Sequence, residues 1–216
     1  MKMPPNKKPS NRNSISLNKF ISQTGMCSRR EADHWIEQGR VKINDIKAKK
    51  GNRVSPEDQV TIDGKPIAKK VPIVYIKYNK PPGITCTTDR RDKSNIIDQI
   101  NFKERIFPIG RLDKNSTGLI LLTNDGDIVN KILRKEHGHE KEYIVKVESP
   151  INQSFIERMS KPIPMLGTKT EPCHVTKIKK DIFKIILTQG LNRQIRRMCE
   201  FCGKKVLTLK RVRIMD

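Results

Sequence analysis

Hydrophobic residues recur along this chain with two different periods, which predicts short helices alternating with short strands. Leu17, Phe20 and Ile21 have the spacing of one face of a helix. Residues 141–147 alternate apolar and polar side chains instead, as a half-buried strand does. The same patterns predict helices near residues 28–39, 96–100, 128–133, 155–159 and 195–202. Strands are predicted at 41–43, 60–62, 73–78, 85–88, 106–109, 119–122 and 205–214, with two more between 175 and 187.

Cap and turn residues mark the limits of several of these elements. Ser28 followed by Glu31 is the capping-box pattern of a helix start, and Gly39 is a typical stop after that helix. Asp63-Gly64 between short apolar runs is a hairpin signal. Asp127 precedes the apolar residues of the helix at 128–133, so we expect it to cap that helix.

The elements divide the chain into four parts. Residues 1–14 contain four basic residues, three prolines and no acid, so we expect a disordered basic arm. Residues 15–67 are predicted to form a small basic domain of two helices and short strands. A short charged linker is expected at 68–72, and a larger domain at 73–216.

The charge of the chain indicates what kind of partner it has. Its 216 residues include 45 basic and 23 acidic side chains, a formal net charge of +22. This balance indicates a polyanionic partner, either nucleic acid or an acidic membrane surface. No apolar stretch approaches the ~18 residues of a membrane span, and the N-terminus lacks the apolar core of a signal peptide. We therefore expect a soluble, cytoplasmic protein that does not bind membranes.

The cysteines and histidines are the candidate metal ligands of this chain. Five cysteines at irregular spacing do not form a disulfide framework, which fits a reducing compartment. Cys199 and Cys202 form a single C-x-x-C, and His137 and His139 share one loop. A structural zinc site needs four ligands in a defined arrangement. We interpret Cys199 and Cys202 as two small buried side chains one helical turn apart. We interpret the histidine segment as a polar loop, and we expect no metal.

Residues 108–127 form the segment around which the larger domain is organised. A polar loop, 110–118, lies between two apolar runs that are predicted as buried strands. The loop offers one carboxylate, Asp113, and the neighbouring cations Arg111 and Lys114 favour its ionised form. Such a carboxylate suits a nucleophile or an ion-pair anchor. Composition alone favours the simpler interpretation, a solvated turn with incidental charges.

A longer pattern changes that balance. Residues 110–126 read G-R-L-D-x-x-S-x-G-L-[IL]-L-L-T-N-D-G, which resembles the active-site signature of the RsuA/RluF family of pseudouridine synthases. Three further segments resemble motifs of the same family. They are N-K-P-x-G at 79–83, K-x-Y at 141–143 and G-x-x-x-Q-[IV]-[RK]-R-M at 190–198, and the strand at 205–214 resembles the closing L-x-R-x-[RK]-I segment. The resemblance extends from Leu17 to Ile214.

The small domain carries a second resemblance. Its run L-x-K-F-I-x-x-x-G-x-x-S-R-R-E-A, followed by V-x-I-N and G-x-x-V, is similar to the S4 RNA-binding domain. The resemblance implies that Lys19, Arg29 and Arg30 hold RNA, mainly through phosphates, and so contribute affinity and orientation more than sequence choice. The alternative to RNA binding is an ordinary small α/β domain with a charged surface.

The family resemblance implies the fold and the chemistry. The expected fold is α+β, an S4 domain followed by a synthase domain with a central, mostly antiparallel mixed sheet flanked by helices. Asp113 would be the nucleophile, and Arg196 would keep it ionised and placed. Tyr143 would stack on an extruded uracil and assist removal of its C5 proton. The isomerisation needs no redox change and no group donor, so no cofactor is expected.

The resemblance also implies the partners. Arg111 would contact RNA at the gap left by the flipped base, and Lys80, Arg193 and Arg197 are expected among the RNA-binding residues. The Asn192-Arg193 pair, the run 140–143 and the loop 134–139 resemble the branch of the family that modifies large-subunit (23S) ribosomal RNA. Ribosomal RNA is therefore the expected substrate, transfer RNA is a second candidate, and a monomer is expected.

The sequence also allows two other functions, and it differs from the family pattern at one place. The S4 pattern and the net charge alone would suit a non-catalytic RNA-binding or ribosome-assembly factor, although a pure binder has no need of Asp113, Tyr143 and Arg196 together. Asp113 and Thr117 faintly resemble a phosphorylated-aspartate motif, but that chemistry needs a magnesium and nucleotide apparatus that the sequence does not show. Members of the family usually continue past the position of Asp216 with another short strand and a tail. Either this chain is trimmed or it is a short member, so the completeness of the sheet edge there stays open.

Overall fold

The structure, a computed structural model, describes residues 13–67, 71–133 and 138–215. The chain divides into two compact units, residues 1–72 and 73–216, which are described separately. The expected basic arm up to residue 12, residues 68–70 of the expected linker, and residues 134–137 of the loop that contains His137 lie outside the described residues. Within the described ranges, no helix is both long and apolar enough to cross a membrane.

The first unit consists of two short helices beside a small sheet. The helices are α1 (Leu17–Gln23) and α2 (Arg29–Glu37). A four-stranded antiparallel sheet has the order β3-β2-β5-β6. Its strands are β2 (Val41–Ile43), β3 (Ile46–Lys47), β5 (Val60–Ile62) and β6 (Lys65–Pro66), and β1 (Ile15–Ser16) pairs separately with β4 (Arg53–Val54).

Local signals explain these elements. The predicted capping box is present at the start of α2, because Glu31 N donates to Ser28 Oγ at 3.1 Å and Ser28 N donates to Glu31 Oε2 at 3.3 Å. The predicted Asp63-Gly64 hairpin joins β5 to β6, and both residues have positive φ, as such a turn requires. The apolar sides of both helices are buried against the sheet in one core that includes Leu17, Ile21 and Ala32.

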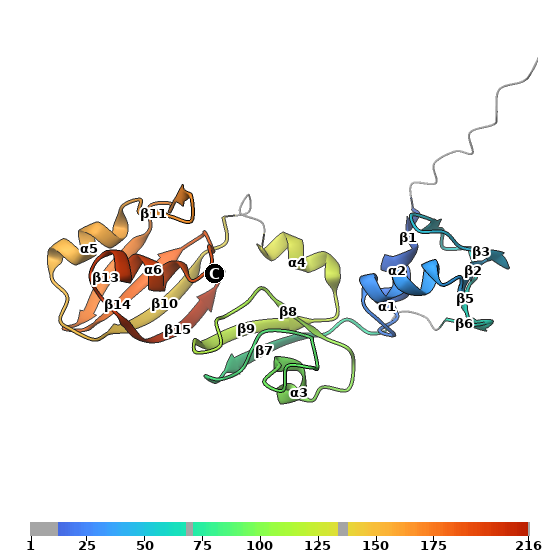
Figure 1. Cartoon of the computed structure of the whole chain (residues 1–216), viewed down its shortest axis with the longest axis horizontal. Helices are drawn as coiled ribbons and strands as arrows, with labels where there is room; N and C mark the ends of the chain where they lie inside the picture. Colours follow the sequence, from blue (N-terminus) through green and yellow to red (C-terminus); the bar gives the residue numbers. More distant parts are fainter. Residues whose placement is uncertain (1–12, 68–70, 134–137, 216) are drawn as a thin grey trace, which may run out of the picture. The chain divides into compact units, whose positions relative to one another are not determined.

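The second unit is built on one seven-stranded sheet with the order β13-β14-β10-β15-β9-β7, to which β8 is added on β9 (Figure 1). All pairings are antiparallel except that between β15 and β9, so the expected α+β fold with a mostly antiparallel sheet is confirmed. The sheet strands are β7 (Tyr75–Lys80), β8 (Phe107–Ile109), β9 (Thr117–Thr123), β10 (Lys141–Val147), β13 (His174–Lys179), β14 (Ile182–Leu187) and β15 (Val206–Ile214). The other elements are α3 (Ile96–Ile100), α4 (Gly126–Leu133), α5 (Gln153–Ser160), α6 (Gln194–Phe201), β11 (Pro164–Met165) and β12 (Thr168–Lys169).

The sheet divides at one point, which we call the fork. Strand β7 pairs along one edge of β9. The other edge of β9 pairs with β15 only at Thr117 and Gly118, and with β8 from Leu121 onwards. Gly118 allows β15 to approach, because a Cβ added there would lie 2.1 Å from the backbone oxygen of Arg211, and its φ is +101°. This close contact joins the two halves of the sheet.

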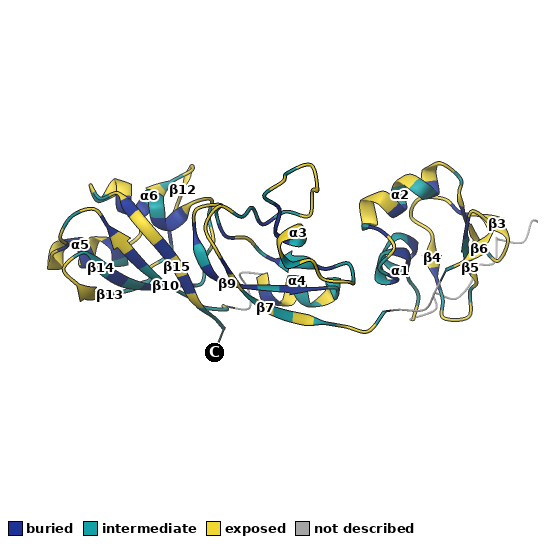
Figure 2. Cartoon of the chain, turned by 90° about the horizontal axis from the view of Figure 1, so that it is seen from below, coloured by how far each residue is buried: buried dark blue, intermediate teal, exposed yellow. Residues whose placement is uncertain are grey.

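Helices pack against strands of the sheet, and many of the buried side chains lie on its strands. Helix α5 packs along β13, α6 beside β15, and α4 beside β8 (Figure 1). Buried residues are concentrated on the central strands, and exposed residues on loops and the outer sides of helices (Figure 2). Cys199 is buried in this core and Cys202 packs against it, in agreement with the interpretation as small apolar side chains.

Three predictions differ from the structure. The first strand of the second unit is β7, which begins at Tyr75 rather than residue 73. Residues 85–88 do not form a strand, since Thr85 makes one isolated bridge to Asn95 and its neighbours belong to a loop. Asp127 is the second residue of α4 rather than its cap, and its N–H donates to Asp125 Oδ1 at 2.9 Å. Asp125 therefore satisfies a donor of the first turn.

Candidate active site

The loop between β8 and β9 holds Asp113, and the neighbouring backbone is fixed by hydrogen bonds. Ser116 N donates to Asp113 O at 2.9 Å, which closes a tight turn. Leu112 N donates to Cys86 Sγ at 3.3 Å. These contacts hold the residues on both sides of the carboxylate, whose side chain is 34% exposed. The carboxylate is therefore accessible while its backbone is held in place.

Lys80, at the end of β7, supports the same loop through a hydrogen bond to its backbone. It is 1% exposed, and its Nζ donates to the backbone oxygens of Pro81, Ile84 and Lys114 at 2.9, 2.8 and 3.1 Å. Burial lowers the pKa of the Lys80 ammonium, and Asp113 partly opposes that shift. The structure therefore gives the Lys80 ammonium a supporting contact with three carbonyl groups, and its contact with RNA stays a prediction.

Arg196 lies on α6 and faces the loop. Ile195, Met198 and Cys199 anchor the helix in the core, which leaves Arg196 on the side toward Asp113. Its Nε lies 3.6 Å from Asp113 Oδ2, and its side chain is 11% exposed. That distance is an ion pair rather than a hydrogen bond, and Nε has no hydrogen-bond partner in the described part of the chain.

Two other groups hold the guanidinium of Arg196. Its Nη2 donates to Ser116 Oγ at 3.4 Å, and its Nη1 donates to the backbone oxygen of Val206 at 3.5 Å. Ser116 is buried, and its own N–H closes the turn at Asp113. The serine thus contacts both members of the ion pair, a link that motif matching alone did not reveal.

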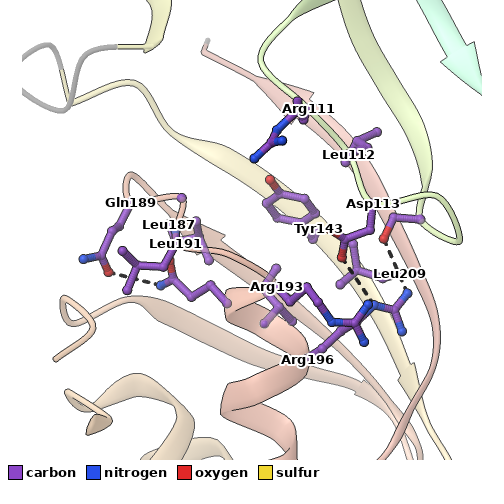
Figure 3. A pocket seen from close by; sticks show the side chains of 14 residues that line it. Arg111, Leu112, Asp113, Tyr143, Leu187, Gln189, Leu191, Arg193, Arg196 and Leu209 are labelled. Atoms are coloured by element: carbon purple, nitrogen blue, oxygen red, sulfur yellow. Dashed lines mark hydrogen bonds and ion pairs between the residues drawn. The ribbon is translucent and has the colours of Figure 1, made fainter. Parts of the chain in front are cut away.

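Tyr143 comes from the middle of the sheet. On β10 it stands opposite Arg211 of β15 and Ile185 of β14, and it is 8% exposed. Asp113, Tyr143 and Arg196 line one pocket of about 120 Å³, together with Arg111, Leu209 and Arg193. Figure 3 shows Arg111 directed toward the Tyr143 ring and Asp113 directed toward Arg196. Three segments far apart in the sequence therefore place an acid, a ring and three cations around one space.

The segment before α6 also lines this pocket. Gln194 Oε1 accepts from Leu191 N at 2.9 Å, and Gln194 Nε2 donates to Gln189 Oε1 at 3.2 Å. This buried glutamine shapes the loop that presents Arg193, which is exposed and has a φ of +50°. Gln194 belongs to the motif at 190–198, but the motif does not say what the residue does. Its burial and its two hydrogen bonds indicate that it holds the loop in place.

The other predicted RNA-binding residues lie elsewhere. Arg29 and Arg30 are exposed in the first turn of α2, and Lys19 is half-buried on α1, all in the first unit. Arg197 does not line the pocket. Its Nε donates to the backbone oxygen of Asn192 at 3.1 Å. The pocket therefore brings together Arg111 and Arg193 with the three predicted catalytic residues, and none of the other predicted RNA contacts.

The residues that could bind a metal are scattered. Among residues 13–67, 71–133 and 138–215, no group of three or more metal-ligating side chains is present. Burial raises the pKa of the Cys199 thiol to about 12, which disfavours the thiolate that a metal would need. The pocket itself offers one carboxylate and several cations, a set suited to an anionic substrate.

Comparisons with known proteins identify the family. The family model described as RNA pseudouridylate synthase matches residues 74–201, and the S4 domain model matches 16–60. The dual-specificity RNA pseudouridine synthase RluF of Escherichia coli K12 is 53% identical over 205 residues, covering 94% of this chain and 71% of the relative. Ribosomal large subunit pseudouridine synthase B of Bacillus subtilis is 33% identical, covering 90% of this chain and 83% of the relative.

The comparison of structures agrees. A crystal structure of a pseudouridylate synthase, 29% identical, superposes with a TM-score of 0.65 and covers 93% of this chain and 88% of its own. These similarities do not fit the alternative of a non-catalytic RNA-binding factor. The chain therefore belongs to the RsuA/RluF family of RNA pseudouridine synthases, which are isomerases, and it carries an S4 domain before the synthase domain.

Proposed function

We propose that this protein converts a specific uridine of 23S ribosomal RNA to pseudouridine, with Asp113 as the nucleophile. The observation that carries the proposal is the convergence of Asp113, Tyr143 and Arg196 on one pocket, with Arg196 Nε 3.6 Å from Asp113 Oδ2. The choice of RNA is supported by the relatives, one of which is named for the large ribosomal subunit. We propose transfer RNA as a second substrate class; the name of another relative, a dual-specificity RNA pseudouridine synthase, states two specificities.

The reaction is an isomerisation, so the pocket must supply few groups. The bond between N1 of uracil and C1′ of ribose breaks, the base turns, and a bond between C5 and C1′ forms. The proton on C5 leaves, and N1 gains one, so composition and oxidation state do not change. An anionic nucleophile, an acceptor for the C5 proton and a place for an extruded base are sufficient. We propose that no cofactor takes part.

Arg196 is proposed to keep Asp113 charged and oriented. The guanidinium is mostly buried, and Ser116 and Val206 hold it, so its position costs little further ordering when RNA binds. The carboxylate, more exposed than its partner, is the group that approaches the ribose or the base. Attack on C1′ and assistance in glycal formation both start from this ionised aspartate.

Tyr143 and Arg111 are proposed to handle the base. The ring of Tyr143 forms a wall of the pocket beside Leu209, which leaves a slot with apolar surfaces for a uracil. Stacking on such surfaces offsets part of the cost of unstacking the base from RNA. Arg111 is directed into the same space and would contact RNA where the flipped base has left the helix.

The first unit and the surroundings complete the proposal. Arg29, Arg30 and Lys19 of the S4 domain are proposed to bind RNA phosphates and to orient the substrate. Arg193 and Arg197 are proposed to contact RNA near the pocket. The enzyme is proposed to act as a monomer in the cytoplasm.

The test is a comparison of Asp113→Asn with the wild type and with Glu157→Gln, which removes one exposed carboxylate from α5. Pseudouridines are mapped in unmodified 23S ribosomal RNA after incubation with each protein, and RNA affinity is measured in parallel. We expect Asp113→Asn to bind RNA nearly as well as the wild type and to form no product. Glu157→Gln should behave as the wild type. Single-turnover product from Asp113→Asn at the wild-type rate would overturn the assignment of the nucleophile.

A further inference from the structure

A second, larger cavity adjoins the pocket at the fork of the sheet. This cleft has a volume of about 1020 Å³ and shares Arg111, Asp113, Tyr143 and Arg193 with the pocket. One side is apolar, from β8 and α4. The described residues that line it include one acid, Asp113, and five cations: Arg111, Lys114, Lys141, Arg193 and Arg211. Two of those cations, Lys141 and Arg211, have no role in the chemistry described above.

Arg211 is buried at the fork with one donor group unused. It is 4% exposed, and its Nε donates at 2.7 Å to the backbone oxygen of Leu119, on the stretch of β9 between its β15 and β8 pairings. Its Nη2 is buried and has no hydrogen-bond partner in the described part of the chain. A buried donor without a partner is costly, most of all on a charged group, so such a group points to a missing acceptor.

Lys141 lies beside Arg211, and it too has an N–H group without an acceptor in the described part of the chain. Its Nζ donates to the backbone oxygens of His139 and Thr188 at 3.1 and 2.8 Å, which leaves one of three N–H groups. Burial lowers the pKa of the Lys141 ammonium, and the charge of Arg211 lowers that pKa further. No carboxylate forms an ion pair with either residue among the described residues. Two neighbouring cations thus lie in a partly buried site, and neither has an ion-pair partner in the part of the chain that the structure describes.

We propose that Lys141 and Arg211 form a subsite for one phosphodiester group of the RNA strand next to the target uridine. This inference rests on the proposed function, because it assumes that RNA occupies the pocket at Tyr143. Tyr143 and Arg211 are direct partners on β10 and β15, so a strand whose base lies at Tyr143 passes this subsite. A phosphate offers charged oxygens to both cations, and arginine and lysine are the usual phosphate ligands. A neutral base would leave the repulsion between the cations uncompensated.

The experiment is a double-mutant cycle between the protein and the RNA backbone. The protein variants are Lys141→Met and Arg211→Met. The control is Lys210→Met, an exposed lysine of β15 adjacent in sequence to Arg211 and outside the cleft. The probes are short RNAs with a single uridine, each with one neutral methylphosphonate linkage at a different position around it. Affinity is measured for every pair over a range of salt concentrations.

The proposal predicts coupling at one linkage. There, the neutral linkage should weaken wild-type binding about tenfold and reduce the salt slope by about 0.7. The same linkage should have less than a twofold effect on Lys141→Met and Arg211→Met, while Lys210→Met should respond as the wild type. Lys141→Met keeps the contact between Arg211 and Leu119, so it decides the result if Arg211→Met does not fold.

Other outcomes overturn the proposal. Additive effects of every linkage and both variants would mean that no RNA phosphate occupies the subsite. A second arm replaces chloride by inorganic phosphate at constant ionic strength. Stabilisation of the wild type but not of Lys141→Met by phosphate, together with additive RNA effects, would mean that the subsite takes only free anions. Because these readouts measure binding, they remain interpretable if the RNA is not converted, which is the outcome that would contradict the proposed function.

Discussion

Gly118 is the position where a single methyl group should separate the two halves of the sheet and of the active site. Asp113 belongs to the loop that leads into β9, whereas Arg196 lies on the helix that precedes β15. Only two residue pairs join these strands, Thr117 with Lys210 and Gly118 with Arg211. We therefore expect Gly118→Ala to damage both stability and turnover.

The size of the effect follows from the geometry. The new Cβ would lie 2.1 Å from the backbone oxygen of Arg211, whereas ordinary contacts begin at 3.4 Å, so the strands must separate by about 1.3 Å. The φ of +101° at this position adds about 1 to 3 kcal/mol of strain for alanine. Overpacking against backbone adds about 1 to 3 kcal/mol. The free energy of unfolding should therefore fall by roughly 2 to 6 kcal/mol.

A loss of turnover is expected in addition to the loss of stability. A separation of that size would lengthen the distance of 3.6 Å between Arg196 Nε and Asp113 Oδ2 to nearly 5 Å. Misplacement by about 1 Å typically reduces turnover about a hundredfold. The assay is single-turnover formation of pseudouridine at a temperature where the variant is folded, with urea unfolding to measure stability.

Gly167→Ala is the matched control. Gly167 has a φ of +73°, but a Cβ there would meet nothing within 4 Å, so it reports the cost of positive φ alone. We expect this variant to lose about 1 kcal/mol or slightly more and to keep full turnover. If Gly118→Ala had the stability of Gly167→Ala and wild-type turnover, the close approach of β9 and β15 would not be what holds the site together.

Three further predictions concern other parts of the molecule. Lys80→Met should lower the free energy of unfolding by about 2 to 4 kcal/mol in urea titrations, because three backbone carbonyls lose a charged donor, whereas Lys77→Met on the exposed side of β7 should change it little. An equal effect of the two variants would contradict the supporting role of Lys80. Replacement of Arg29 and Arg30 by glutamine should reduce the salt slope of RNA binding by about 0.7 to 0.9 for each phosphate contact, and an unchanged slope would place both residues outside the RNA interface. Burial raises the pKa of the Cys199 thiol to about 12, so this thiol should resist iodoacetamide at neutral pH until the protein unfolds. Labelling of Cys199 in the native protein would contradict its burial. Stoichiometric zinc in the same sample would mean that metal binding, not burial, protects the thiol.

The amino-acid sequence by itself determined the features that depend on near neighbours. The capping box at Ser28, the turn at Asp63-Gly64 and the strand at 141–147 all follow from contacts or alternation within a few residues. The family and its S4 domain were also readable, because their motifs are contiguous runs. Asp113, Tyr143 and Arg196 were selected in this way, and the structure brings these three side chains to one pocket.

Tertiary structure alone decided what the charged side chains do. Lys80 and Arg193 are both basic residues in family motifs, yet one is enclosed by three carbonyl groups and the other is exposed at the pocket. Burial depends on segments that are distant in sequence, such as the loop of Lys114 for Lys80. No local pattern contains that information, so the sequence does not predict that Lys80 is enclosed.

The fork is the clearest case of a feature that only long-range pairing creates. Gly118 and Arg211 become neighbours because a parallel pair forms between strands separated by most of the second unit. From that pairing follow the cleft, the unused donor of Arg211 and the link through Ser116 between Asp113 and Arg196. Hydrophobic periodicity predicts that these strands exist, but it does not choose their partners, because the choice depends on packing over the whole sheet.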